Sequence, residues 1–476
     1  YIGEYLWYNP LIAFVEAGVI KLTGIPPMGL VTKGGALLNI VSVFMFYLMV
    51  TYLFGSSVAI AATASFLFFT SGNIPSWGAA TYSPWLYPQN FVQSIFYLGI
   101  ICCCKAFSKP GYTGFLIAGA VTGIAFLGHT APALILLFIT GVLFLKSIYQ
   151  AVKIKLPGEA NKFMRLGFLF SLVFIIVSLP LTFFVIGKYK LHMVNTITFE
   201  YNDPLFIWFN FLTLIKENIS FTLPFVLIGC FYILYKLKDK LKRNFLFYWF
   251  GACVLFFIYT SVITILRVKW GLRFPGLVPA FHFFFYLKAL QSVLFGIGFI
   301  YLLQFVYRKI KKRNLKNEHL QAYTTLLVLL VFLIYYPVYS KRQDFYFMRE
   351  YGLKQSAASE EIEIYHWLLH NSSINVVIVC DEDFSCFPVM ASGRKLVAVI
   401  ATMSNPYVSY VKRNADRNLI LNSLHSGSIN NAKELLNEYS VKFILLENSK
   451  IKNETALENN FGEPIFKNNK FSIYKN

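Results

Sequence analysis

Charge is scarce in this chain, and acidic residues are scarcest in its first three quarters. Of 476 residues, 14% are charged and 57% are hydrophobic, whereas a soluble domain carries about 25% charged residues. Residues 1–340 hold 27 Lys and Arg but only 8 Asp and Glu, while residues 341–476 hold 16 and 15. This shortage excludes an ordinary soluble protein for residues 1–340. It predicts a membrane domain there, followed by a nearly neutral second domain at 341–476.

Several signature motifs are also missing from the sequence. It contains no CxxC pair of the zinc-binding kind, no Walker A loop, no Rossmann fingerprint and no GxSxG motif. His366 and His370 share a helix face, but no Glu follows His366 as a metalloprotease motif requires. The basic loops lack interleaved aromatic residues, so no nucleic acid is expected as a partner.

Ten apolar runs predict membrane-spanning helices. A helix needs about 20 apolar residues to cross the hydrocarbon layer, so the shorter runs must extend into their flanking aromatic residues. The expected spans are 35–54, 56–70, 91–104, 113–128, 131–148, 164–187, 221–235, 245–266, 276–306 and 323–340.

Every second loop between these runs is rich in Lys and Arg. Positively charged loops stay in the cytoplasm, and the alternation holds if the long run at 276–306 crosses the membrane once. The sequence therefore predicts a polytopic helical protein of the plasma (cytoplasmic) membrane, with its C-terminal domain extracytoplasmic. Four loops carry 18 basic residues, against 8 on the opposite side: 105–109, 146–165, 236–243 and 308–316.

The C-terminal domain shows an alternation of helical and extended segments. Residues 355–370 have a helical pattern, and further helices are expected near 405–414 and 430–439. Short runs rich in Val, Ile and Leu are typical of buried strands, and a closing hairpin is expected at the end of the chain. This order predicts an α/β domain, with strands at 375–380, 395–400, 442–447, 466–467 and 471–474.

The few acids of the membrane domain are unevenly placed. Five of the eight lie on the predicted external side, and charges near a bilayer are costly unless they have a role or contact water. We predict Glu4, Glu200 and Asp203 as catalytic residues, and ordinary loop acids are the alternative. The two other external acids are Glu16 and Glu217.

Three external cations break the trend of positive loops inside. Arg267, Lys269 and Arg273 lie within one short loop, and a guanidinium group matches the oxygens of a phosphate. We predict that they bind substrate, while pairing with Glu200, Asp203 or a lipid headgroup is the alternative. His129 stands at a tight external turn and is a further candidate for substrate binding, or else a helix cap.

Several short stretches together resemble the GT-C class of membrane glycosyltransferases, which use polyprenyl-phosphate-linked sugars. Residues 8–11 (YNPL) and 22–25 (LTGI) are similar to a run at the end of that class's first external loop. The similarity continues in residues 87–89 (YPQ) and 123–129 (GIAFLGH), and in the tail at 392–395 (SGRK) and 405–407 (NPY).

The resemblance implies a sugar-transferring enzyme whose donor is a polyprenyl-phosphate sugar and whose acceptor is a glycan, a lipid or a protein. It implies an Asp or Glu after the first span, acting as a base or helping to hold a divalent cation such as Mg or Mn. Glu4 lies too close to Pro10 for that spacing, so we expect the family's acid, and a further span, upstream of Tyr1. The WWDYG motif of the oligosaccharyltransferase branch is absent from this sequence, so transfer of a whole oligosaccharide to asparagine is not expected.

Three other functions stay open. A lipid-linked glycan polymerase or ligase would need paired Arg residues in a large external loop, and residues 188–220 contain no Arg. A transporter would show repeated halves and polar residues at mid-membrane, but no such repeat is visible and charge within the predicted spans is limited to Lys288. A non-catalytic GT-C-like scaffold subunit becomes the better interpretation if no acid follows the expected upstream span.

Overall fold

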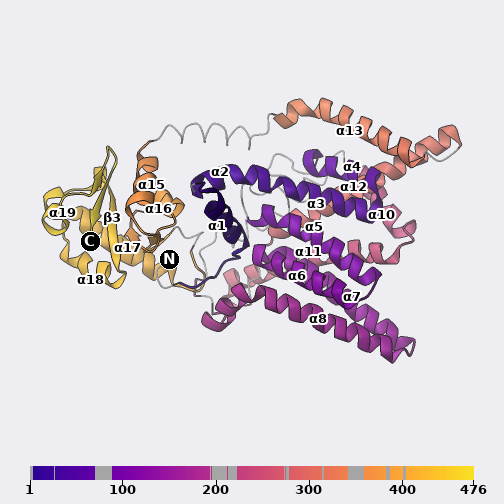
Figure 1. The fold of residues 1–476 in the computed structure, drawn as a ribbon, viewed down its shortest axis with the longest axis horizontal. Coiled ribbons are helices and arrows are strands. Elements are labelled where there is room, and N and C mark those ends of the chain that lie inside the picture. The colour runs from indigo at the N-terminus through magenta and orange to yellow at the C-terminus, as the bar shows by residue number, and fades with distance from the viewer. Residues whose placement is uncertain are drawn as a thin grey trace.

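The structure is a computed structural model of a long helical bundle joined to a small α/β part (Figure 1). The residues it describes are 4–25, 27–69, 88–192, 194–195, 212, 222–272, 274, 278–312, 316–340, 359–381, 386–399 and 404–476.

Apolar helices form at all ten places where the sequence predicts spans. Six in the described part of the chain are long and apolar enough to cross a bilayer: Pro88–Ser108 (α5), Thr130–Lys153 (α7), Pro157–Lys188 (α8, Pro157–Thr182, with η3), Lys240–Arg267 in α11 (Lys240–Trp270), His282–Lys311 (α12) and Asn317–Ile334 in α13 (Asn317–Ser340). Four are shorter: Ile40–Phe54 (α3), Ser56–Phe68 (α4 with η1), Tyr112–Gly128 (α6) and Leu223–Tyr235 (α10). How many of them cross the membrane stays a prediction.

The run at 276–306 begins its helix later than expected. Helix α12 starts at His282 and continues without a break to Lys311. Pro279 lies before the helix, and its carbonyl accepts a hydrogen bond from the His282 N–H. Two shorter helices, α1 (Leu11–Thr23) and α2 (Pro27–Leu38), precede the bundle.

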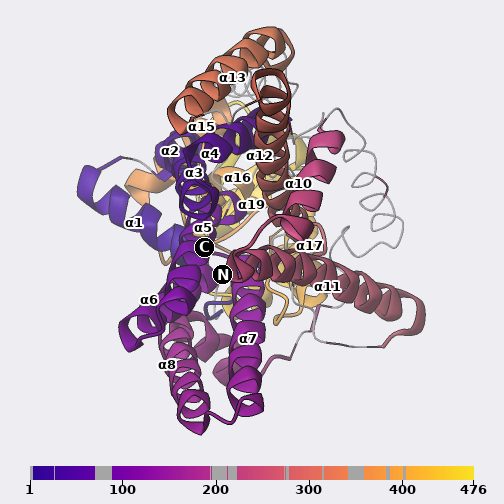
Figure 2. The same ribbon diagram turned by 90° about the vertical axis from the view of Figure 1, so that its right-hand side faces the viewer.

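Glycines let several helices of the bundle pack backbone to backbone. A Cβ atom added at Gly298 of α12 would lie 1.9 Å from the carbonyl oxygen of Phe225 in α10, and one at Gly229 would lie 2.0 Å from that of Leu294. Helices in lipid gain little from hydrophobic burial and associate through such close contacts. Figure 2 shows α10 and α12 side by side.

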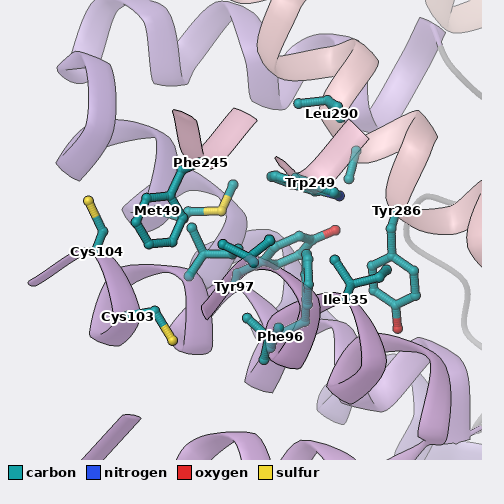
Figure 3. Close-up of a cluster of buried hydrophobic side chains, with 14 of the residues drawn as sticks. Met49, Phe96, Tyr97, Cys103, Cys104, Ile135, Phe245, Trp249, Tyr286 and Leu290 are labelled. Carbon is teal, nitrogen blue, oxygen red and sulfur yellow. The ribbon is translucent and has the colours of Figure 1, made fainter. Parts of the chain in front are cut away.

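An aromatic cluster fills the centre of the bundle, where α5, α11 and α12 meet (Figure 3). The ring of Phe96 lies edge-on to Trp249 and Tyr286, with ring centroids 5.1 and 4.6 Å away. All three side chains are almost completely buried, so this cluster fixes the register of three helices.

The α/β part is a five-stranded sheet in the order β2-β1-β3-β5-β4. Strands β2 (Lys395–Leu396), β1 (Val377–Val379) and β3 (Val441–Glu447) are parallel, and β5 (Phe471–Lys475) and β4 (Phe466–Lys467) form the antiparallel closing hairpin. Helices cover the sheet: α15 (Ser359–Asn371), α16 (Cys386–Ala391), α17 (Tyr410–Ser426), α18 (Asn430–Glu438) and α19 (Glu454–Phe461).

The helix expected near 405–414 is displaced. Helix α17 runs from Tyr410 to Ser426, and the Ser409 hydroxyl caps it by accepting a hydrogen bond from the Lys412 N–H at 3.2 Å. Asn405 and Pro406 lie before the helix, in a turn that contacts the helical bundle. Asn405 and Pro406 belong to the stretch that carries part of the GT-C resemblance.

Candidate active site

The α/β part sits at one end of the helical bundle, away from the turns that follow α5, α7 and α12 (Figure 1). Asn195, beyond the end of η3 (Phe183–Lys188), makes the contact. Its amide group donates hydrogen bonds to the carbonyl oxygens of Asn405 and Val408 at 2.6 and 2.7 Å, and its oxygen accepts one from the Tyr410 N–H at 2.9 Å. The predicted basic loops and the α/β part therefore lie at opposite ends of the molecule.

Glu4 takes part in this joint between the two parts. Its carboxylate lies 3.2 Å from a guanidinium nitrogen of Arg413 and accepts a hydrogen bond of 2.9 Å from the Asn405 amide. The side chain of Glu4 is only 6% exposed. Burial raises the pKa of Glu4, although Asn405 and Arg413 act in the opposite direction. The predicted catalytic role of Glu4 stays a prediction, and its carboxylate already has two partners from the α/β part.

Tyr189 completes the joint. Its hydroxyl accepts hydrogen bonds from the Tyr5 N–H at 2.7 Å and from the Asn405 amide at 3.1 Å, and donates to the Tyr5 carbonyl at 2.9 Å. Its ring stacks on Tyr407, with centroids 4.8 Å apart. The donor position and both acceptor positions of the hydroxyl are thereby filled. We call the five residues that connect the two parts the polar joint: Glu4, Tyr189, Asn195, Asn405 and Arg413.

His129 lies where the sequence predicts a tight turn, between α6 and α7. It is 3% exposed, and its Nδ1 atom caps α7 by accepting a hydrogen bond from the Ala131 N–H at 3.2 Å. The His129 ring stacks on that of His282 at the start of α12, with centroids 4.7 Å apart and planes 28° apart. The structure therefore places His129, a predicted substrate contact, against a second histidine.

The N-terminal segment is hydrogen-bonded to the turn that holds this histidine. The side-chain amide of Asn9 donates hydrogen bonds to the carbonyl oxygen of Phe126 at 2.5 Å and to the hydroxyl of Thr130 at 3.4 Å. These two residues flank the turn that holds His129. Asn9 lies within the YNPL stretch, so this part of the resemblance has a structural counterpart.

Two of the three predicted phosphate-binding cations lie at the end of α11. Arg267 is half-buried and Lys269 is exposed, and both belong to the last turn of the helix before Gly271, which ends it with φ of 65°. Cations at a helix C-terminus are favoured by the helix dipole, so this placement alone does not require a bound anion. Arg273, Glu200 and Asp203 lie outside the described residues.

The sequence alone does not identify the site residues that contact one another from distant segments. Arg413, Tyr189 and Asn195 carry no motif, because their roles arise from contacts between segments about 200 residues apart or more. His282 is visible in the sequence as a polar residue at the start of a long apolar run, but its stacking on His129 is not.

A divalent cation is implied by the resemblance, and the described residues do not fit one. Among them, no group of three or more His, Cys, Asp or Glu side chains is placed to hold a metal ion.

Comparison with known proteins identifies the fold. No protein-family model and no curated protein sequence matches this chain. ArnT from Cupriavidus metallidurans, solved with bound undecaprenyl phosphate, is similar with a TM-score of 0.51 and 12% identity, over 99% of this chain and 88% of ArnT. Apo ArnT gives a TM-score of 0.45 at 11% identity, with the same coverage.

The match to a second solved protein extends over a smaller share of that protein's length. The oligosaccharyltransferase of Archaeoglobus fulgidus, in complex with Zn and sulfate, matches with a TM-score of 0.46 and 12% identity over 96% of this chain. This chain spans 60% of that enzyme's length. ArnT and the oligosaccharyltransferase are GT-C glycosyltransferases, and the likeness to ArnT confirms the predicted resemblance at the level of the fold.

Proposed function

We propose that this chain, which has the GT-C fold, is a membrane glycosyltransferase. It transfers a sugar from a polyprenyl-phosphate-linked donor to a glycan, lipid or protein acceptor on the extracytoplasmic side of the plasma membrane. The observation that carries the proposal is the similarity to ArnT over nearly the whole of both chains, because that structure contains undecaprenyl phosphate. The proposed units are a GT-C-like membrane domain at 1–340 and an extracytoplasmic domain at 341–476.

We propose that the end of the bundle beside the α/β part supplies the groups that such a reaction needs. A polyprenyl phosphate is a leaving group that must be stabilised by positive charge as it departs. Arg267 and Lys269 end α11, and we place the phosphate there, with Arg273 following in sequence. His129 contacts the sugar or the phosphate from the start of α7.

The acids have different parts in this proposal. Glu4 holds the α/β part to the bundle through Arg413 and Asn405. Glu200 and Asp203 follow Asn195, which itself contacts the α/β part, and we keep both as candidates for activating or orienting the acceptor.

Transfer of labelled sugar from a polyprenyl-phosphate donor by the full chain in lipid nanodiscs tests the proposal. The Arg267→Gln variant should raise KM for the donor by about 10- to 100-fold, since a hydrogen bond to a charged group contributes about 1.5–3 kcal/mol. Lys240→Gln, at the opposite end of α11, is the matched control and should behave like the wild type. Glu200→Gln and Asp203→Asn should lower kcat. No transfer across a broad panel of donors and acceptors would refute the proposal.

A non-catalytic GT-C-like scaffold is the second candidate. It is favoured by the engagement of Glu4 in the polar joint, which leaves that carboxylate with partners other than a substrate. Such a scaffold would bind undecaprenyl phosphate in the same nanodiscs without turning over any polyprenyl-phosphate sugar.

A further inference from the structure

Two histidines from distant helices meet at the end of the bundle, and only one of them is explained by packing. His129 is required as the cap of α7. His282 begins α12 with its ring between those of His129 and Phe281, at centroid distances of 4.7 and 4.2 Å. A phenylalanine would fill the same stack, and among the described residues only Nδ1 of His282 has a backbone partner, the Pro279 carbonyl, so its Nε2 atom calls for a separate explanation.

Backbone contacts fix which nitrogen of each ring carries a proton. The Nδ1 atom of His129 accepts a hydrogen bond from the Ala131 N–H, so it bears a lone pair and the proton of the neutral ring is on Nε2. The Nδ1 atom of His282 lies 3.1 Å from the carbonyl oxygen of Pro279, which can only accept. His282 therefore has its proton on Nδ1 and a lone pair on Nε2.

The stacked pair thus offers one donor and one acceptor side by side. The Nε2 atom of His129 presents an N–H, and the Nε2 atom of His282 presents a basic lone pair. Neither atom has a hydrogen bond within the part of the chain that the structure describes. A hydroxyl group has one proton to donate and two lone pairs to accept with, so it can satisfy both rings at once.

The same face of α12 carries a further polar atom for which the described residues provide no partner. Tyr286 follows one turn after His282 and is 1% exposed. Its hydroxyl is buried, and no hydrogen bond reaches it from the described residues. Buried polar groups normally have partners, so this hydroxyl, one turn along α12 from His282, is consistent with a polar ligand on the same face of the helix.

We infer that His282 is the catalytic base that takes the proton of the acceptor hydroxyl, while the Nε2–H of His129 orients that hydroxyl. This inference rests on the proposed function and, of the two roles kept open there for Glu200 and Asp203, leaves them that of orienting the acceptor. The acceptor O–H proton moves to Nε2 of His282 as the acceptor oxygen forms its bond to the anomeric carbon of the sugar. The bond from that carbon to the phosphate oxygen breaks, and its electron pair leaves with the polyprenyl phosphate.

The geometry limits the pair to one charge at a time. Two positively charged rings in contact would repel each other strongly, so protonation of His282 requires His129 to stay neutral. Because Nδ1 of His129 accepts the cap hydrogen bond of α7, protonation of His129 would also remove that cap. The pair can therefore take up the single proton that the transfer step releases, and it holds it on His282.

Substitutions can separate the two nitrogens of each ring. In His282→Asn, the shorter amide can still donate to the Pro279 carbonyl, whereas His282→Gln keeps a hydrogen-bond acceptor near the position of Nε2 but cannot take a proton. In nanodiscs, both variants should lower kcat by about 10²- to 10⁴-fold with little change in KM for the donor. His129→Asn retains a capping oxygen and should raise KM for the acceptor. His366→Asn, on the exposed face of α15, is the matched control.

The outcomes distinguish this inference from the proposed function. If the wild type transfers sugar and His282→Gln stays within about threefold of it in kcat, the inference fails and the proposed function stands. If the wild type transfers nothing, the proposed function fails. In that case ¹⁵N spectra of histidine-labelled protein still decide the tautomers: a proton on Nε2 of His282 overturns the inference, and one on Nδ1 supports its geometric premise.

Discussion

The helical bundle and the α/β part are stabilised in different ways. In the bundle, α10 and α12 touch through glycine, with backbone atoms of one helix where a side chain of the other would be. In the α/β part, the sheet separates two clusters of buried aliphatic and aromatic side chains, one on each face. The contact between α10 and α12 leaves no space for an added side-chain atom, whereas the clusters on the sheet lose stability when a buried side chain is shortened. Water supplies the driving force for burial in the α/β part, but lipid supplies little for the bundle.

A substitution that removes side-chain volume should therefore damage the α/β part most. Ile444 lies in β3 and is completely buried. Ile444→Ala should reduce the free energy of unfolding by about 2–5 kcal/mol, through lost burial and the cavity left behind. Leu419→Ala, at a position 48% exposed on α17, is the control. Limited proteolysis of the full chain should show cleavage within 359–476 while the helical bundle stays intact. Equal cleavage of the bundle and the α/β part would show that the two parts do not differ in this way.

Adding a single methyl group should be the damaging change in the bundle. Gly298→Ala would place a Cβ atom 1.9 Å from the Phe225 carbonyl oxygen, so α10 and α12 must move apart, at a cost of about 1–3 kcal/mol. Gly251→Ala, where nothing lies within 4 Å of the added atom, should be neutral. The thermal unfolding temperature in nanodiscs measures both variants. A lowered value for Gly251→Ala but not for Gly298→Ala would show that close backbone contact is not what stabilises the bundle.

The contribution of Glu4 in the polar joint to the stability of the protein should decrease as the pH rises. Burial raises the pKa of Glu4 above its ordinary value, so the folded protein favours the protonated carboxyl group more than the unfolded chain does. Its contribution to stability is fully present below about pH 4.5 and is lost as the pH rises through the raised pKa. Glu4→Gln removes this dependence. The variant should match the wild type in unfolding temperature in acid and be at least as stable at neutral pH.

A different pH course would reveal a different role for this carboxylate. If the ion pair with Arg413 dominated, the wild type would gain stability over Glu4→Gln as the pH rises from 4 to 7. The comparison of the two proteins across that range therefore separates an effect of burial from an effect of the ion pair.

The sequence predicts local structure well wherever one segment determines it. The apolar runs predict the places of the helices because hydrophobic length alone sets them, although α12 begins only at His282. The hairpin of β4 and β5 follows from two short apolar runs that are close in sequence. The start of α17 is misplaced because the turn at Asn405 forms contacts to the bundle instead of a helix.

The candidate site is less predictable because its residues come from distant segments. The bond between Glu4 and Asn405 joins residues 401 positions apart. The stacking of His129 on His282 joins the start of α7 to the start of α12. Composition and spacing identify His129, Arg267 and Lys269 as polar groups in unusual places, but only the arrangement of helices shows which of them have neighbours.

A lipid phosphate should bind at the end of the bundle beside the α/β part. A photoreactive undecaprenyl phosphate, with a diazirine next to the phosphate, tests it most directly when cross-linked to the full chain in nanodiscs and mapped by mass spectrometry. We predict adducts in the peptides that contain Arg267–Trp270 and His282–Tyr286, competed away by unlabelled undecaprenyl phosphate. Competable adducts confined to the opposite end, at Lys240–Arg243 or Arg308–Lys311, would show that the lipid phosphate does not bind beside the α/β part.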